Sequence, residues 1–314
     1  MISSELDAAG VREPSLREAY RQCRDINAAH GKTFFLATRL LTPRQRPAVH
    51  ALYGFARGAD DILDEFDERD VEQRADELQQ LSKRLFAALV QDEPCDDHPT
   101  LRAVVDTART YDISWDLFDD FLASMRMDLT VTDYPDRAAL EHYMYGSAEV
   151  IGLQMLPVLG TVGPREEAAP YAAALGKAFQ LTNFIRDVDE DLSRGRIYLP
   201  ADELAAHGVD RDLLLWCQRE GRSDTRVRTA LAEQHAITRA VYDAARPGID
   251  ELAPCSRPCV ASALTLYSEI LDRIEAIDFE IFGRRATVGK PRRLAVAVAG
   301  LGKAWANRLR FGSV

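Results

Sequence analysis

Two groups of acidic residues, far apart in the chain, have the spacing of residues on one helix face. The first group contains Asp60 and Asp64, with Tyr53 and Arg57 before them. Because a helix turns about 100° per residue, side chains three or four positions apart lie on one face. We therefore expect Asp60 and Asp64 to point the same way, with Arg57 and Tyr53 extending the stripe.

The second group forms a similar stripe from Asn183, Asp187 and Asp191, with Gln180 leading into it. Amide and carboxylate oxygens are ligands for hard cations, and Mg²⁺ completes its shell with water and substrate phosphates. The adjacent Arg186 offers a planar fork of donors that suits a phosphate group. Two such stripes on two helices predict metal-assisted chemistry on a diphosphate.

Each stripe taken alone has a simpler interpretation, because acidic residues on helices usually face water. The largely apolar run at 48–56, just before Asp60, argues instead that the first helix is substantially buried. A buried carboxylate needs a cation or hydrogen-bond donors. Arg57 can serve one aspartate as an ion pair, but it cannot neutralise Asp60, Asp61 and Asp64 together.

The elements that must position these stripes are helices. Ala, Leu, Arg, Glu and Asp dominate, and apolar runs with the two-residue period of strands are scarce. A loop is expected at 194–200, between Gly195 and Pro200. These features predict one all-α domain. The expected helices span 15–30, 43–65, 71–90, 100–111, 114–127, 137–156, 165–192, 211–218, 222–245, 254–281 and 290–309.

Composition restricts the class of protein. The chain has 314 residues, of which 46% are hydrophobic, and a net charge of −11. An acidic chain is a poor partner for nucleic acid, whose phosphates demand a basic surface. Its five cysteines are scattered and odd in number, which favours reduced thiols in a cytoplasmic protein. No signal peptide and no membrane-spanning segment are expected from the sequence.

Ordered motifs give the chain a resemblance to a known family. These are Tyr53-x3-Arg57-x2-Asp60-Asp61-x2-Asp64, then the run 180–191, then Gly195-Arg196-Ile197-Tyr198-Leu199-Pro200. From about Tyr20 to Lys290 the sequence resembles the squalene/phytoene synthase family, and its wording is most similar to the bacterial phytoene synthases. The segment 30–41, the run 143–152, Tyr267 and Arg285 resemble further family segments.

This resemblance implies the all-α isoprenoid synthase bundle with its active site in a central cavity. It implies that Mg²⁺, or alternatively Mn²⁺, binds between the two stripes and bridges prenyl diphosphates. The implied metal ligands are Asp60, Asp64, Asn183, Asp187 and Asp191. The implied catalytic residues are Tyr53, Arg57, Asp60, Asp64 and Asp187. The implied substrate-binding residues are His30, Lys32, Thr33, Tyr53, Arg57, Gln180, Arg186, Tyr267 and Arg285.

The reaction implied by the resemblance joins two prenyl diphosphates head to head through a cyclopropyl diphosphate. The expected substrate is geranylgeranyl diphosphate and the expected product is phytoene, made without NADPH in carotenoid biosynthesis. Thr38 and His50 stand where enzymes that make C30 products tend to carry bulky aromatics, which favours the longer substrate. The alternatives are a squalene or dehydrosqualene synthase that uses farnesyl diphosphate, a terpene cyclase, and a non-catalytic scaffold relative.

Two positions depart from the family pattern. Met144 stands where the family often has Cys, and Glu149 stands where a small residue is common. We expect Glu149 to form an ion pair with a neighbouring helix, with a charge beside the pocket as the alternative. Asp189 replaces a frequent Gly and is expected to face water.

The last segment of the chain is basic and amphipathic. Residues 286–314 contain six Lys and Arg, at positions 290, 292, 293, 303, 308 and 310, and no acidic residue. Such a helix can lie on anionic lipid, or it can pack on the acidic body of the protein. We expect a tail at 1–14, the helical domain at 15–289, and a C-terminal helix at 290–314 that contacts the domain or a membrane surface.

Overall fold

The computed structural model describes residues 2–64 and 69–311, apart from the side chains of Asp64 and of residues 308–311. Within these ranges the regular elements are helices, and two isolated β-bridges pair residues that lie outside them. The all-α prediction is confirmed. The helices are α1 (Ile2–Ala8), α2 (Pro14–His30), α3 (Lys32–Thr38), α4 (Arg46–Asp64), α5 (Val71–Val90), α6 (Pro99–Tyr111), α7 (Trp115–Met127), α8 (Arg137–Met144), the π-helix η1 (Tyr145–Glu149), α9 (Val150–Leu159), α10 (Arg165–Arg186), α11 (Val188–Ser193), α12 (Ala201–Ala206), α13 (Arg211–Glu220), α14 (Thr225–Ala245), α15 (Gly248–Glu251), α16 (Arg257–Ala276) and α17 (Lys290–Phe311).

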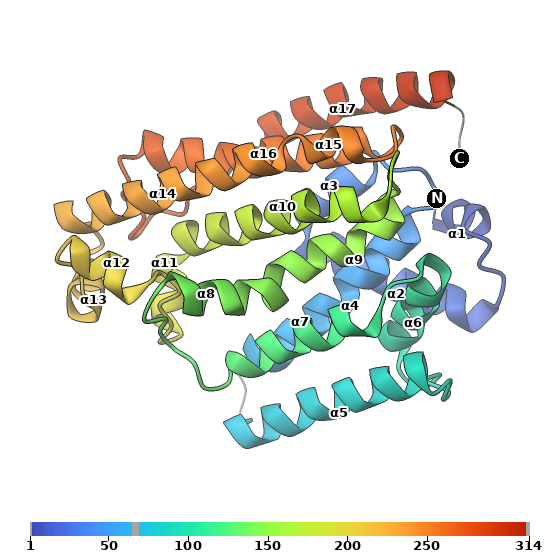
Figure 1. Ribbon diagram of the computed structural model, residues 1–314, viewed down its shortest axis with the longest axis horizontal. Helices are drawn as coiled ribbons and strands as arrows, with labels where there is room; N and C mark the ends of the chain where they lie inside the picture. The colour runs from blue at the N-terminus through green and yellow to red at the C-terminus, as the bar shows by residue number, and fades with distance from the viewer. Residues whose placement is uncertain (1, 65–68, 312–314) are drawn as a thin grey trace.

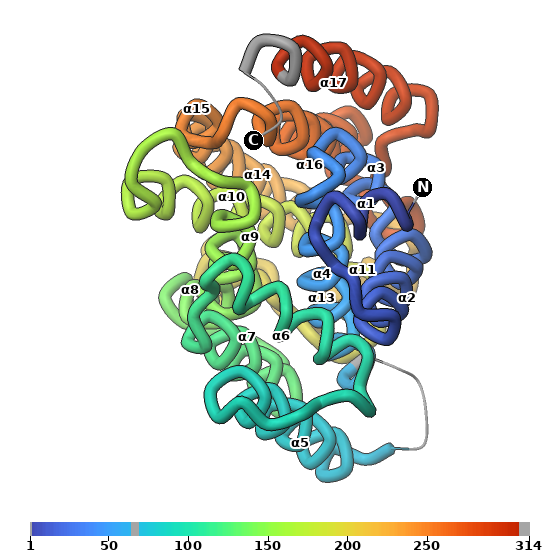
Figure 2. The backbone as a smooth tube through the Cα atoms, turned by 90° about the vertical axis from the view of Figure 1, so that its right-hand side faces the viewer, coloured from blue at the N-terminus to red at the C-terminus, as the bar shows by residue number. Residues whose placement is uncertain are grey.

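Helix α10 runs through the middle of the bundle. It packs on η1 and α9 on one side and on α14 and α16 on the other (Figure 1). Helix α4 packs on α2, α6 and α9, and α3 packs on α16. The view at right angles shows α17 on the outer side of α16, near α3, and α5 at the opposite end of the molecule (Figure 2). The helices α4 and α10, which carry the two acidic stripes, are therefore both central.

Two expected helices are interrupted in the structure. The helix expected at 165–192 is wrong as a single element, because it divides at Asp187 into α10 and α11. Asp187 pairs with its own neighbour Arg186, a contact that adjacent positions on a regular helix do not favour because they point about 100° apart. The hydrogen bonds from Asp187 N to Asn183 O and from Asp191 N to Asp187 O persist at 2.8 Å, so the stripe keeps its face.

The helix expected at 137–156 contains a π-helical turn, η1, between α8 and α9. Gly146 in this turn lies so close to α7 that an added Cβ would overlap the Asp120 carbonyl oxygen and Ser124 Oγ. The wider turn lets the backbone follow α7 at this close approach, and nothing in the local sequence pattern predicts it.

Smaller differences concern helix ends and short helices. Pro43 lies in the turn before α4, which begins at Arg46 and not at Pro43 as expected. Ser114 caps α7 through its side chain, as expected. The short helices α1, α3, α12 and α15 were not expected, since each has fewer than eight residues and too little periodicity to be recognised.

All five cysteines are free in the structure. Among the helices of the described residues, none has both the length and the apolar content that crossing a bilayer requires.

Candidate active site

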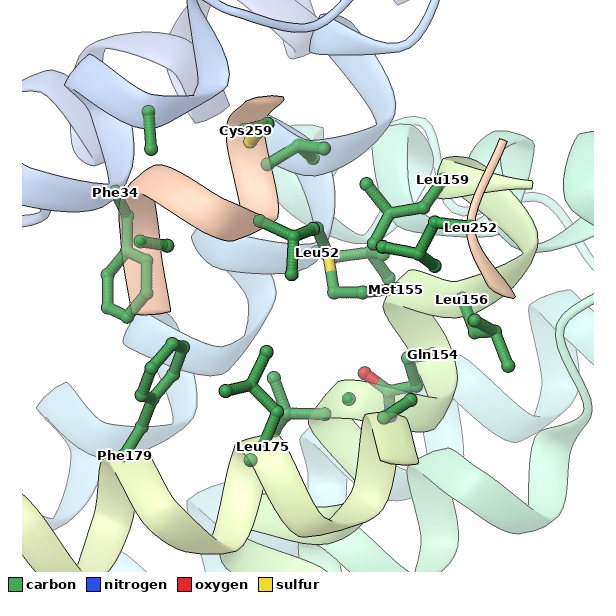
Figure 3. Close-up of a pocket in the computed structure, with 18 of the residues that line it drawn as sticks. Phe34, Leu52, Gln154, Met155, Leu156, Leu159, Leu175, Phe179, Leu252 and Cys259 are labelled. Carbon is green, nitrogen blue, oxygen red and sulfur yellow. The ribbon is translucent and has the colours of Figure 1, made fainter. Parts of the chain in front are cut away.

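An apolar cavity of about 310 Å³ lies inside the bundle, between α3, α4, α9, α10 and α16. Figure 3 shows Phe34 and Phe179 facing each other at one end, with Leu52, Met155 and Leu175 further in. The side chains that line it are almost all hydrocarbon, with Gln154, Asn27 and Thr38 among the few polar ones. Such a cavity suits a long apolar substrate chain.

The cavity follows α10 from Phe179 to Ala168. At 1.5 Å per residue this stretch of helix is about 16 Å long. The face turned to the cavity carries small residues at Ala168 and Ala172, which leave room along the helix, while Gly176 lets α10 approach η1 closely. The end far from Phe179 is closed by residues of four elements, namely Leu156, Leu159, Tyr171, Ala245, Gly248, Ile249 and Leu252.

A charged cluster lies at the C-terminal end of α10, about two helical turns beyond Phe179. Arg186 donates to Asp187 through two hydrogen bonds, one of them from Nε to Oδ1 at 2.8 Å. Arg285 approaches the same carboxylate at 2.9 Å and also lies 3.1 Å from Glu190. These residues line a second pocket of about 370 Å³ that also includes Arg284. The polar end of α10 is therefore a mixed cluster of arginines and carboxylates.

Tyr267 on α16 connects this cluster to the cavity and to α4. Its ring centroid is 4.4 Å from that of Phe179 and 5.0 Å from that of Phe34. Burial raises the pKa of its hydroxyl to about 12, which the nearby Arg186 opposes, while Tyr53 and Asp187 are also close enough to act on it. The hydroxyl of Tyr267 therefore lies between the two predicted stripes.

The first stripe lies on α4, as predicted. Arg57 pairs with Asp61 across one helical turn, as one aspartate was expected to do. Burial raises the pKa of Tyr53, an effect that Arg57 opposes and that Asp60 and Asp61 reinforce. The Nε of Arg57 is buried without a hydrogen-bond partner. The side chain of Asp64, which was also predicted as a ligand, lies outside the described residues.

The second stripe contains unsatisfied oxygen ligands. The amide of Asn183 donates to Gln180 at 3.3 Å, but its oxygen Oδ1 is buried without a partner. Burial, and then the charge of Asp187, raise the pKa of Asp191 to about 8. A buried acceptor beside a carboxylate that resists ionisation is a site that a bound cation would stabilise. The oxygens of Asn183, Asp187 and Asp191 therefore fit a hard divalent metal ion.

No three carboxylate, imidazole or thiol side chains converge on one point within residues 2–63 and 69–307. Two features of the site account for this. One predicted ligand, Asn183, is an amide, and the carboxylate of Asp187 is turned toward Arg186 and Arg285. A metal ion that binds here must compete with these arginines.

The loop motif 195–200 contacts the two helices that carry the second stripe. Gly195 adopts a φ of +76°, which favours glycine, and Arg196 N donates to Asp191 O at 2.9 Å. The ring of Tyr198 stacks on Phe184 with centroids 4.3 Å apart, and its hydroxyl donates to Asp128 Oδ1 at 3.1 Å. The motif thus anchors the backbone around Asp191 and the α10 side chain next to Asn183.

The predicted contact segment 30–33 forms the junction of α2 and α3, beside Tyr53. An added Cβ on Gly31 would lie 2.8 Å from the Tyr53 ring. His30 and Lys32 are exposed, and Thr33 is half-buried. The structure thus places the segment near the first stripe, but it records no contact that tests a role in substrate binding.

Glu149 forms the expected ion pair and does not line the cavity. Its carboxylate lies 3.8 Å from Lys177 Nζ on α10, and burial raises its pKa while Lys177 lowers it.

Thr38 does line the cavity, but its hydroxyl donates to Phe34 O. His50 packs on Phe35 outside the cavity lining. Of the two residues used to argue for a long substrate, only Thr38 lines the cavity and can affect the length of the substrate.

Asp189, expected to face water, instead accepts hydrogen bonds from Gln218 Nε2 at 2.9 Å and from Gly283 N at 3.2 Å.

Sequence reasoning missed the aromatic pair Phe34 and Phe179 at the mouth of the cavity. It also missed the small residues of α10. Their signal was present, because Ala168, Ala172, Gly176 and Gln180 recur every four residues and lead into the acidic stripe.

Comparisons with known proteins agree with this geometry. The sequence model of the squalene/phytoene synthase family matches residues 27–292. A chloroplastic phytoene synthase of Daucus carota is 38% identical over 93% of this chain and 72% of its own length. A second one, from Solanum lycopersicum, is 37% identical over 89% of this chain and 88% of its own length.

Solved structures show the same fold. A dehydrosqualene synthase in complex with a ligand superposes with a TM-score of 0.82 at 26% identity, covering 93% of this chain and 98% of that one. A squalene synthase from Alicyclobacillus acidocaldarius superposes with a TM-score of 0.75 at 25% identity, covering 87% and 98%. The expected isoprenoid synthase bundle is confirmed.

Proposed function

The chain belongs to the squalene/phytoene synthase family, and we propose how its residues perform the reaction of a prenyltransferase of the phytoene synthase type. That reaction condenses two molecules of geranylgeranyl diphosphate to phytoene, in carotenoid biosynthesis. The C1–O bond of one substrate breaks, its diphosphate leaves, and the electron pair of the C2=C3 double bond of the other substrate forms a bond to the resulting C1 cation. Loss of a proton gives a cyclopropyl diphosphate. The second diphosphate then leaves, and rearrangement and loss of a second proton give the hydrocarbon.

One observation carries the proposal. The apolar cavity ends at Phe34 and Phe179, and the charged end of α10 lies about two helical turns further on, with Tyr267 packed on both aromatic rings. A prenyl diphosphate has the same division, with a long hydrocarbon chain and a charged head. Its C1 carbon, where the bonds break and form, would lie beside the aromatic rings.

The enzymes of this family generally depend on a divalent metal, and we propose Mg²⁺ here, with Mn²⁺ as the alternative. Asp60 and Asp64 would hold it on α4, and Asn183, Asp187 and Asp191 on α10 and α11. The orphaned oxygen of Asn183 and the raised pKa of Asp191 support this assignment. When bound, the metal supplies positive charge that stabilises the leaving diphosphate.

Cationic and hydroxyl side chains share this task. We propose that Arg186 and Arg285 donate to diphosphate oxygens, since both line the second pocket beside Asp187 and present planar forks of donors. Arg57 and Tyr53 would do the same from α4, and His30, Lys32 and Thr33 from the α2–α3 junction. Gln180 would orient Asn183, to which it is hydrogen-bonded, and Tyr267 would hold Arg186.

The cavity itself protects the carbocations. Its walls are almost wholly hydrocarbon, and water that entered would capture the cation as an alcohol. The aromatic rings of Phe34, Phe179 and Tyr267 present their electron-rich faces near the expected position of C1 and would stabilise a cation there.

An alternative substrate is the C15 farnesyl diphosphate. The solved structures that superpose are a dehydrosqualene synthase and a squalene synthase, whereas the curated relatives named above are phytoene synthases. The small residues Ala168 and Ala172, which extend the cavity along α10, favour the longer substrate.

The test is to incubate the purified protein with Mg²⁺ and either diphosphate, with and without NADPH, and to identify the extracted hydrocarbons by mass. We expect a C40 product from the C20 substrate that does not require NADPH. Asp187→Asn should lower turnover about 100-fold or more. Asp189→Asn is the matched control, because that carboxylate is engaged by Gln218 and Gly283. A C30 product from the C15 substrate alone would overturn the substrate assignment.

We also propose that the protein works in the cytoplasm, at the surface of a membrane. Five free cysteines, four of them buried, support a reducing compartment. The apolar product supports a membrane surface, because phytoene must reach lipid after release.

A further inference from the structure

Helix α17 exposes a continuous apolar stripe. Leu294, Val298, Leu301 and Trp305 are spaced by four, three and four residues and therefore share one face. Their side chains are 61%, 59%, 50% and 68% exposed. No other helix in the described part of the chain exposes as many large apolar side chains. Isolated exposed apolar residues are ordinary, but an aligned stripe of this kind marks an interaction surface.

A different face of α17 is already occupied by the bundle. Ala297 and Ala304 are 6% and 1% exposed. Gly300 lies so close to α3 and α16 that an added Cβ would be 2.7 Å from Leu40 and 2.8 Å from Ser262. Asn307 Nδ2 donates to Pro254 O at 2.7 Å. The helix is thus fixed in place, and its exposed stripe cannot turn inward without breaking these contacts.

The charge of the segment is opposite to that of the rest of the chain. Residues 286–314 carry +6, so the remaining residues carry −11 − 6 = −17. Arg292 pairs with Glu269 on α16, whereas Lys290 and Lys303 are exposed. The side chains of Arg308 and Arg310 lie outside the described residues. A segment with this charge is attracted to an anionic surface, while the acidic body is repelled from it.

We propose that the outer face of α17 lies on an anionic lipid surface, with Leu294, Val298, Leu301 and Trp305 inserted among the acyl chains. Two features favour lipid over a protein partner. The stripe is apolar while the unpaired charges that accompany it are all basic, which is the pattern of helices that lie in the plane of a bilayer interface. A second copy that paired through its own α17 would instead bring two segments of charge +6 together.

The position of α17 gives the contact a purpose, which rests on the proposed function. The helix covers α16 and α3 (Figures 1 and 2). These two helices form one wall of the cavity through Phe34, Thr38, Cys259 and Ala263. Binding by α17 would therefore set this wall against the bilayer, where an apolar product can leave the cavity without crossing water. The assignment of residues 290–314 as a C-terminal helix separate from the helical domain is part of this proposal.

The first test measures vesicle binding without substrate. Purified protein is sedimented with vesicles of phosphatidylcholine containing phosphatidylserine, and with vesicles of phosphatidylcholine alone. We expect binding to the anionic vesicles that weakens as salt is added. Lys290→Glu with Lys303→Glu should weaken binding about fivefold for each charge removed, and more for the reversal. Lys83→Glu with Arg219→Glu, exposed on α5 and α13, is the matched control and should bind like the unmodified protein.

The apolar stripe is tested by replacing its four residues with serine. We expect loss of vesicle binding by about tenfold or more. Val71→Ser with Val90→Ser on α5, where the side chains are 54% and 49% exposed, should leave binding unchanged. Circular dichroism and the melting temperature show whether each variant is folded. Equal binding by the folded α17 variant and the unmodified protein would overturn the proposal.

Trp305 provides a direct readout of insertion. It is one of three tryptophans and is 68% exposed, so its emission should shift to the blue when anionic vesicles are added. Trp305→Phe should abolish the shift while the protein still sediments with the vesicles.

Prenyl transfer measured in detergent should be the same in all these variants. Absence of turnover in the unmodified protein, with vesicle binding intact, would count against the proposed function and not against the lipid contact. Concentration-dependent self-association lost in the serine variant, with vesicle binding retained, would assign the stripe to a second copy and also overturn the proposal.

Discussion

The guanidinium of Arg285 lies 2.9 Å from the carboxylate of Asp187, a predicted metal ligand at the end of α10. Arg186 donates to both oxygens of the same carboxylate. Asp187 is therefore neutralised by two arginines where substrate and metal are not bound. A metal ion held by this carboxylate would compete with two guanidinium groups whose donors match the oxygens of a diphosphate. Arginines released from Asp187 would then be free to donate to the substrate.

Arg285→Gln separates these effects. Without the competing guanidinium, Mg²⁺ should bind the substrate-free protein several-fold more tightly by calorimetry, because Asp187 has one cation fewer to release. The KM for the prenyl diphosphate should rise about tenfold, because a charge-assisted contact to the diphosphate is lost. Arg284→Gln removes one positive charge from the same pocket but leaves both Arg285 contacts in place. If Arg284→Gln changed metal affinity equally, general charge and not displacement would be the cause.

A second prediction concerns the close contact between α10 and η1. Gly176 on α10 lies against η1, where an added Cβ would overlap the Ala148 carbonyl oxygen. Gly176→Ala should lower the free energy of unfolding by about 1–3 kcal/mol, because backbone must shift. Gly58→Ala on α4 meets nothing within 4 Å, so it should stabilise the protein by about 0.5–1 kcal/mol. Urea denaturation of both variants checks this, and equal effects would contradict the packing argument.

The sequence predicted which helices carry the two acidic stripes, but not the local geometry of those helices. The stripes on α4 and α10 were recognisable because helical periodicity is local and survives the break at Asp187. The break itself, and the π-turn at Gly146, depend on contacts with Arg186 and α7 that no local pattern encodes. Phe34 and Phe179 were missed for a similar reason, since their pairing joins α3 to α10 across the fold. The roles of the individual site residues stay predictions until the variants are measured.

A third prediction concerns pH. Burial lowers the pKa of His50 to about 3, helped by the charges of Arg24 and Arg46. Asn27 Nδ2 contacts His50 Nδ1 at 3.1 Å, as expected for a neutral ring that accepts there. In the unfolded chain the pKa is near its ordinary value of 6.5. Between pH 6.5 and 3 the unfolded state therefore binds a proton that the folded state does not.

The sign follows from this difference in bound protons. The free energy of unfolding should fall as the pH falls below 6.5, by up to about 1.4 kcal/mol per pH unit from this residue. His50→Phe should reduce that slope between pH 6.5 and 4, whatever its effect at pH 8. His142→Phe, at an exposed position on α8, is the control and should leave the slope nearly unchanged. Urea melts at several pH values measure both, and equal slopes in His50→Phe and the unmodified protein would exclude His50 as the cause.

The last prediction concerns the length of the substrate. Ala168 lines the closed end of the cavity, about 16 Å along α10 from Phe179. A larger side chain there occupies the space of the last isoprene unit of a C20 chain but leaves the part near the diphosphate intact. Ala168→Leu should therefore lower kcat/KM for geranylgeranyl diphosphate about tenfold or more. Turnover of farnesyl diphosphate should be kept or increased, because its shorter chain does not reach Ala168. Competition between the two substrates, read as the ratio of C40 to C30 products, measures the switch directly. The retained C15 activity is also the control for folding, since overpacking that disturbed the bundle would lower both. A proportional loss with both substrates would mean that the substrate chain does not extend along α10 to Ala168.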